Sequence, residues 1–140
     1  MNYLFLALII SIIWGTVPFF TKYVLNKIHY KTLILLESIL AFFIAMIFCC
    51  CNKSEIMSDF QNIDGLCLLA IILIGLMIFN ANIFYYTIIK DHETYLINAL
   101  TSTSPLIVLF ISYFFLHEKM DLIKIIGVFS IVFGVFCVTR

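Results

Sequence analysis

Long runs of hydrophobic residues, separated by short polar clusters, dominate the pattern along this 140-residue chain. A run such as LILLESILAFFIAMIF does not alternate between apolar and polar positions, so it predicts a helix rather than a strand of a barrel. Each run approaches the about 20 residues that a helix needs to cross a bilayer. The pattern therefore predicts five membrane-spanning helices, at residues 3–25, 32–51, 66–89, 95–116 and 122–139.

Composition supports a membrane location and excludes other classes of protein. Hydrophobic residues make up 64% of the chain and charged residues 11%, whereas soluble domains average about 45–50% and about 25%. A soluble domain of this length could not bury so much apolar surface, and a disordered chain would be poor in it. Eight basic residues balance eight acidic ones without a run of like charge, which argues against nucleic-acid binding. We expect an all-α integral membrane protein, by default of an inner or plasma membrane.

The loops between the predicted spans carry nearly balanced positive charge. Short connections make consecutive helices antiparallel neighbours, and residues 52–65 form the longest one, which we expect to be a solvated loop. Five spans would place five basic residues on one side of the membrane, against three and the N-terminal amine on the other. The positive-inside rule then places the N-terminus outside. So small a difference also fits insertion in both orientations, which we state as a hypothesis.

Glu37 is the one acid embedded in an apolar run, about six residues into the second predicted span. Because charge in hydrocarbon is costly, such residues tend to face the interior of a helix bundle or a cavity. An acid here could exchange a proton against a substrate or attract a cation. It could also lie near the headgroups and hydrogen-bond to a neighbouring helix. The sequence leaves both interpretations open.

The third predicted span carries Asn80 and Asn82. Asn82, Tyr85 and Tyr86 share one helical face through spacings of three and four residues. Asparagine beside phenols can line a polar cavity that binds an amide, a carboxylate or an ammonium group. Buried asparagine can equally hold membrane helices together by hydrogen bonds.

The fourth predicted span opens with a hydroxyl-rich segment that contains Asn98 and Ser102, both on one stripe with Pro105. Pro105 removes a backbone donor and frees the carbonyl group near Thr101, so we expect a kink there. Nearby hydroxyl groups can satisfy such a break. A kinked half-helix of this kind suits a substrate site or a hinge, and a tightly packed interface of small residues is the alternative.

The first and last predicted spans hold further special positions. Pro18 follows Trp14 by one turn, so we expect the first helix to kink there. Trp14 lies near the middle of its span, where it could line a cavity and stack on a cation or simply pack. Gly127 and Gly134 are seven residues apart and face the same way, which predicts a seam for close packing of another helix.

Nothing in the chain points to enzyme chemistry, a cofactor or a metal site. Nucleophile, zinc-protease and phosphate-loop motifs are absent from the sequence. The five cysteines form no CxxC pair and the three histidines fall in loops or at span ends. The run Cys49–Cys51 lies where the second span meets water, as apolar filler or as a site of reversible palmitoylation.

Several segments, taken in order, resemble an EamA domain, the five-helix unit of the drug/metabolite transporter superfamily. The segments are WGTVPFFTK, TSPLIVLF, FLHEKMD and IGVFSIVFG. The matching positions are Trp14, Gly15, Pro18, Pro105, Glu118, Lys119, Gly127 and Gly134. The resemblance covers essentially residues 1–140 as one unit.

The resemblance implies transport of a small molecule between two such units at mid-membrane. It implies a homodimer of this chain, and the balanced charge fits an antiparallel pair. Glu37 departs from the family, many of whose members place an arginine near this point. We therefore expect a transporter or exporter of small metabolites or amphipathic cations, working by alternating access. The alternative is a non-transporting membrane subunit that stabilises a partner protein. The expected cavity residues are Glu37, Trp14, Asn80, Asn82, Tyr86, Asn98 and Ser102.

Overall fold

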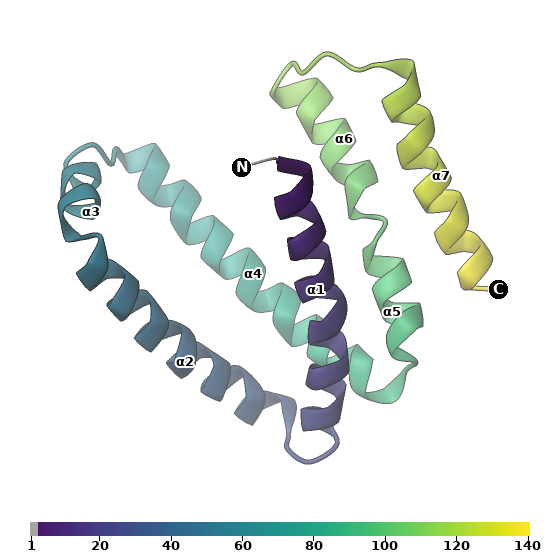
Figure 1. Ribbon diagram of the computed structural model, residues 1–140, viewed down its shortest axis with the longest axis horizontal. Coiled ribbons are helices and arrows are strands. Elements are labelled where there is room, and N and C mark those ends of the chain that lie inside the picture. Colours follow the sequence, from purple (N-terminus) through teal and green to yellow (C-terminus); the bar gives the residue numbers. More distant parts are fainter. Residues whose placement is uncertain (1–2) are drawn as a thin grey trace. The chain divides into compact units, whose positions relative to one another are not determined.

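The computed structural model describes residues 3–140, and every regular element within that range is a helix. The elements are α1 (Tyr3–Leu25), α2 (Tyr30–Cys51), α3 (Lys53–Phe60), α4 (Gly65–Asp91), α5 (Thr94–Thr101), α6 (Ser104–Phe115) and α7 (Leu122–Val138) (Figure 1). The expectation of an all-α fold is confirmed. The N-terminal amine, used in the orientation argument, lies outside the described residues.

Within residues 3–140, four stretches of helix are long and apolar enough to cross a membrane. They are α1, α2, α4 and the stretch Thr94–Phe115, which contains α5 and α6. Helix α7 is equally apolar but shorter, with 17 residues. The count of five spans therefore stays a prediction, because α7 falls below the length that a span usually needs.

The chain divides into two compact units. Residues 20–90, which hold the end of α1 with α2, α3 and most of α4, form what we call the α2–α4 unit. The first part of α1 and residues 91–140 form the α5–α7 unit. The boundary between them falls inside α1, after Phe19.

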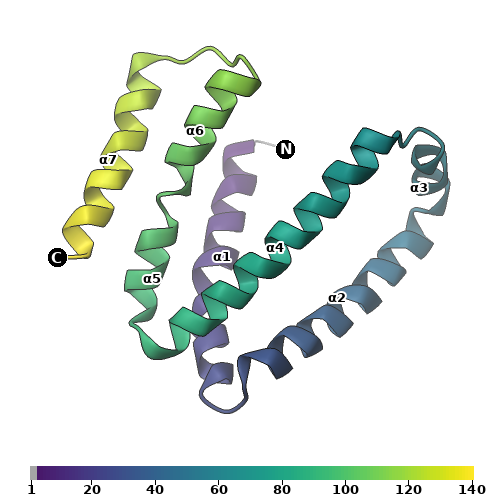
Figure 2. The ribbon, with the colours of Figure 1, turned by 180° about the vertical axis from the view of Figure 1, so that it is seen from behind.

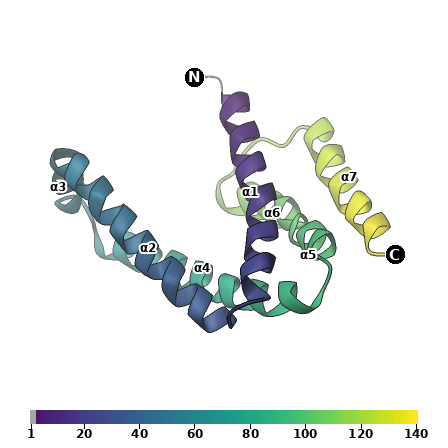
Figure 3. The ribbon, with the colours of Figure 1, turned by 60° about the horizontal axis from the view of Figure 1, so that its bottom comes forward.

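In the α2–α4 unit, α2 and α4 run in opposite directions and α3 lies between the end of one and the start of the other (Figure 3). The core lies at the end of the unit away from α3, where Leu25, Leu33, Tyr86 and Ile89 pack together. Leu25 and Ile89 are almost fully buried. Elsewhere along α2 and α4 the apolar side chains are exposed, as suits helices surrounded by lipid.

Helix α2 begins at Tyr30, two residues before the predicted start at Thr32. The imidazole of His29 caps this end, because its Nδ1 atom accepts a hydrogen bond from the backbone nitrogen of Lys31 at 3.3 Å. Histidine is not among the usual capping residues, which explains why a sequence pattern placed the start later.

Residues 52–65 contain helix α3, so the expectation of a plain solvated loop there is wrong. Helical spacing places Ile56, Met57 and Phe60 on one side of α3, and Glu55 and Asp59 on the opposite side. The chain passes from α2 into α3 through one residue, so α3 begins where the span ends. Eight residues are too few for hydropathy over a whole span to detect such a helix.

In the α5–α7 unit, α6 and α7 are antiparallel neighbours joined by residues 116–121 (Figure 2). Ile97 of α5 and Val135 of α7 are buried. His117 in the connection has φ 52°, a left-handed conformation that non-glycine residues rarely adopt. The next residue closes this turn, because the backbone nitrogen of Glu118 donates to the carbonyl oxygen of Ser112 at 3.2 Å.

The fourth predicted span is two helices rather than one, since α5 ends at Thr101 and α6 begins at Ser104. Pro105 lies in the first turn of α6, where a proline costs no helical hydrogen bond. The chain therefore breaks at Ser102 and Thr103, ahead of the proline. By contrast, α1 continues as one helix through Pro18.

Candidate functional site

Glu37 and Tyr86 are two of the predicted site residues, and the structure brings them into contact from different helices. Glu37 lies seven residues after the start of α2, about 10 Å along the helix axis. Tyr86 lies near the end of α4 and is 6% exposed. Its phenolic Oη donates a hydrogen bond to Glu37 Oε2 at 2.5 Å, across 49 residues of sequence. The bond therefore joins α2 to α4 within one unit.

The hydrophobic core positions this pair. Leu33 precedes Glu37 by one turn on α2, and Ile89 follows Tyr86 by about one turn on α4, so the core residues and the polar pair share the same helix faces. Tyr86 is itself a residue of the core, and its hydroxyl group bonds to the Glu37 carboxylate. Glu37 is exposed on its remaining side. A carboxylate held at one oxygen and open at the other can accept a proton or bind a cation.

The two asparagines of α4 differ from this pair. Asn80 and Asn82 are both exposed, in the same unit as Glu37 and Tyr86. The side-chain amide of Asn80 donates to the carbonyl oxygen of Leu76 at 2.8 Å, so this amide bonds within its own helix. Neither asparagine is in the buried cluster that supports Tyr86.

Trp14, Asn98 and Ser102 lie in the α5–α7 unit. Trp14 is 70% exposed on α1. Asn98 is half-buried on α5, and Ser102 follows the last residue of that helix. The Ser102 hydroxyl donates to the carbonyl oxygen of Asn98 at 2.8 Å. These three residues therefore belong to a different part of the molecule from Glu37, and their role in one cavity stays a prediction.

Hydroxyl groups at the break between α5 and α6 bond to carbonyl groups a few residues earlier in the chain. Thr101 donates to the carbonyl oxygen of Asn98 at 3.0 Å, and Thr103 donates to that of Leu100 at 2.8 Å. Such bonds give the hydroxyl groups partners that hydrocarbon cannot supply. These hydroxyl groups are thus satisfied locally.

A family model of the EamA-like transporter family matches residues 1–140. The chain belongs to the EamA-like transporter family. This EamA-like chain is accordingly a multi-pass integral membrane protein of the drug/metabolite transporter superfamily, whose members are transporters. Comparison with curated proteins and with solved structures gives no match.

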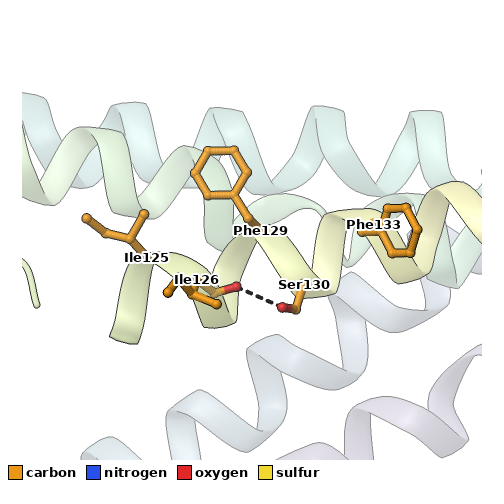
Figure 4. A pocket seen from close by; sticks show the side chains of 5 residues that line it. All are labelled: Ile125, Ile126, Phe129, Ser130 and Phe133. Atoms are coloured by element: carbon orange, nitrogen blue, oxygen red, sulfur yellow. Dashed lines mark hydrogen bonds between the residues drawn. The ribbon is translucent and has the colours of Figure 1, made fainter. Parts of the chain in front are cut away.

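Helix α7 of the EamA-like chain carries a shallow apolar hollow of about 450 Å³ on one face (Figure 4). Its lining residues are Ile125, Ile126, Phe129, Ser130 and Phe133. The Ser130 hydroxyl donates to the carbonyl oxygen of Ile126 at 2.9 Å, so the one polar group here is satisfied within the helix.

A Cβ atom added at Gly127 or Gly134, the positions of the predicted packing seam on α7, would meet open space. Within the α5–α7 unit, therefore, no helix packs closely on the predicted seam.

Two neighbours of the site, Leu33 and Ile89, were not predicted from the sequence as functional positions. Leu33 and Ile89 support the pair, and the half-buried Tyr85 packs against the same core. The available signals were the helical spacings, four residues from Leu33 to Glu37 and three residues from Tyr86 to Ile89.

Within residues 3–140 of the EamA-like chain, no cluster of three or more His, Cys, Asp or Glu side chains could hold a metal ion.

Proposed function

We propose that this EamA-like chain is a secondary transporter in which Glu37, held by Tyr86, binds a cationic substrate or a coupling proton. The observation that carries the proposal is the 2.5 Å hydrogen bond between Tyr86 Oη and Glu37 Oε2. An ionisable residue within a span is costly, so its presence favours a function over a packing role. Family membership supplies the reaction class, which is transport.

Glu37 can be ionised or neutralised, and its hydrogen bond with Tyr86 differs in strength between these two states. With an ionised carboxylate, the phenol donates to the negative charge and holds the side chain in place. When a proton or a cation arrives at the open oxygen, the negative charge is neutralised and the phenol bond weakens. Because the bond joins α2 to α4, occupancy of the carboxylate changes the attachment of these two helices to each other. This is the kind of differential contact that alternating access requires.

We further propose that five helices cross the membrane and that two copies pair to form the working transporter. The near-balance of positive charge between the two sides supports an antiparallel pair. The open surface over Gly127 and Gly134 on α7 leaves room for a helix of the second copy. The expected cavity would then also draw on Trp14, Asn80, Asn82, Asn98 and Ser102.

Proteoliposomes with an imposed proton gradient test the role of Glu37. The measurement is uptake of a radiolabelled quaternary phosphonium cation, with protein-free liposomes as the blank. We expect Glu37→Gln to lower proton-driven uptake at least about tenfold, because the amide cannot take up a proton or neutralise a cation. Tyr86→Phe keeps the carboxylate and loses its donor, so we expect uptake to persist with an altered pH dependence.

Glu55→Gln on α3 is the matched control, since Glu55 is an exposed acid in the first turn of a helix outside the spans. We expect this variant to transport like the wild type. A Glu37→Gln protein with the normal rate and pH dependence would contradict the coupling role. Wild-type liposomes that take up no more cation than the blank would contradict the cationic substrate class.

A further inference from the structure

A groove of about 430 Å³ runs between α6 and α7 in the α5–α7 unit, apart from Glu37 and Tyr86. From α6 and the following connection it is lined by Ser104, Pro105, Val108, Leu109, Ser112, Glu118, Lys119 and Met120, and from α7 by Lys124 and Val128. Its volume falls within the range of small-molecule sites, about 300–1,000 Å³.

The groove has an apolar wall and a charged mouth. Val108, Leu109 and Val128 form the wall along the two helices. Lys119 lies in the connection after α6 and Lys124 in the first turn of α7, so both charges lie at the same end of the helix pair. Ser104, at the other end, is eight residues from Ser112, about 12 Å along α6.

The mouth carries both signs of charge at one end of the α6–α7 helix pair. Glu118, Lys119 and Lys124 are exposed, and within residues 3–140 none of their side chains forms a salt bridge. Asp121 caps α7 through its backbone position only, because its side chain makes no cap hydrogen bond. The backbone nitrogens of Lys124 and Ile125 donate to the carbonyl oxygen of Asp121, so the positive end of the α7 dipole, rather than these amides, would favour an anion beside Lys124.

We propose that this groove binds a zwitterionic phospholipid whose headgroup carries a primary ammonium group, which can donate hydrogen bonds to a carboxylate. Lys119 and Lys124 bind its phosphate and Glu118 binds its ammonium. The upper part of one acyl chain lies along Val108, Leu109 and Val128. The groove is too small for a whole lipid, so the rest of the molecule stays in the bilayer. Mixed charge at the mouth is what distinguishes this class from anionic lipids, which would need positive charge alone.

Native mass spectrometry of the full chain, released from detergent micelles, tests the proposal. The probes are phosphatidylethanolamine, phosphatidylcholine and phosphatidylglycerol at equal ratios to protein. We expect one phosphatidylethanolamine to bind with preference. The double variant Lys119→Gln/Lys124→Gln should weaken binding at least about tenfold, since each lysine supplies a charge-assisted bond. Glu118→Gln should remove the preference for phosphatidylethanolamine over phosphatidylcholine.

Two matched controls keep the result specific to the groove. Val108→Phe fills the groove and should abolish binding, whereas Ile107→Phe adds the same ring at a neighbouring position, 60% exposed and outside the lining. Lys53→Gln removes an exposed lysine of α3 and should leave binding unchanged. Glu37→Gln should also bind lipid normally, so loss of transport and loss of lipid remain separate results.

Several outcomes would overturn the inference. Undiminished lipid binding by Val108→Phe would show that the lipid lies elsewhere. Equal binding of all three lipids, or preference for phosphatidylglycerol, would show that the mixed charge is not what selects the ligand. A change in oligomer mass with Val108→Phe, with no lipid bound to either protein, would show that a second copy of the chain fills the groove.

Discussion

The α2–α4 unit contains a side-chain hydrogen bond between two helices, whereas the hydroxyl groups at the break in the α5–α7 unit bond to carbonyls a few residues away. In the α2–α4 unit, Tyr86 reaches across 49 residues to hydrogen-bond Glu37 on another helix. In the α5–α7 unit, the hydroxyls of Thr101, Ser102 and Thr103 bond to carbonyls three or four residues earlier. The first kind of bond depends on tertiary packing, whereas the second depends only on the local helix.

The two units also differ in how their apolar side chains are buried. The α2–α4 unit concentrates its buried side chains in one cluster around Leu25 and Ile89. In the α5–α7 unit, Ile97 and Val135 are buried singly, and the helix pair keeps an open groove. A polar group within a span is therefore better assigned a function when it is bonded across helices and supported by a core. A polar group that satisfies its own backbone already has a structural explanation.

The largest difference between the units should appear when a leucine is truncated in each. Leu25→Ala removes a side chain that is 1% exposed, and we expect a loss of about 2–5 kcal/mol in the free energy of unfolding. Leu100→Ala on α5 removes the same atoms at a position that is 46% exposed, and should cost less than about 1 kcal/mol. Reversible unfolding in mixed micelles measures both. Equal losses would show that the α5–α7 unit is as tightly packed as the other.

Loss of the hydrogen bond between α2 and α4 should lower the free energy of unfolding more than loss of a hydrogen bond within one helix. Tyr86→Phe deletes the donor to Glu37, and we expect it to lower the free energy of unfolding by about 1–2 kcal/mol. Ser102→Ala deletes a hydroxyl that bonds only to the carbonyl of Asn98, and should change it by less than about 0.5 kcal/mol. The same micelle experiment compares them. A larger loss for Ser102→Ala would reverse the assignment of functional and structural polar groups.

The smallest effect should be a gain, at the turn between α6 and α7. His117 holds φ 52°, which glycine adopts without a clash of Cβ. We expect His117→Gly to raise the free energy of unfolding by about 0.5–1 kcal/mol, because relief of the left-handed strain exceeds the entropy that glycine adds to the unfolded chain, and an increase in melting temperature measures it. His92→Gly is the control, because His92 has no positive φ and glycine there should bring no gain. A lower melting temperature for His117→Gly would mean that the imidazole contributes more than its backbone strain costs.

Much of the fold could be predicted because span-length hydrophobic runs leave few alternatives. The first helix occupies the predicted residues 3–25, and α2 and α4 differ from prediction by at most two residues at either end. Helix α3 could not be found in this way, since its apolar stripe holds only Ile56, Met57 and Phe60. A kink near Thr101 was expected from Pro105, and the helix breaks at the next two residues, so that Pro105 lies in the first turn of α6, where proline is acceptable.

The site could be predicted only as a set of candidates. Glu37 was a candidate because an acid within a membrane span is energetically costly. Tyr86 was a candidate because it lies one helical turn after Asn82 on the same face. That they meet could not be predicted, since the pairing depends on the register between α2 and α4, which the Leu25 and Ile89 core determines. Asn80 was a candidate for the cavity because it is an asparagine within a span, whereas its amide bonds to the carbonyl oxygen of Leu76. Side chains that can bond to their own helix give no sequence signal of whether they do.

The five cysteines are all exposed and free, so chemical labelling of their thiols can determine the orientation of the chain in the membrane. Cys49, Cys50 and Cys51 end α2, and Cys67 lies in the first turn of α4, so these thiols flank α3. Cys137 lies near the end of α7. With five crossings, these two groups face opposite aqueous compartments. A variant that keeps Cys137 alone therefore needs no new label. Its partial reaction with a membrane-impermeant maleimide would count the molecules inserted each way.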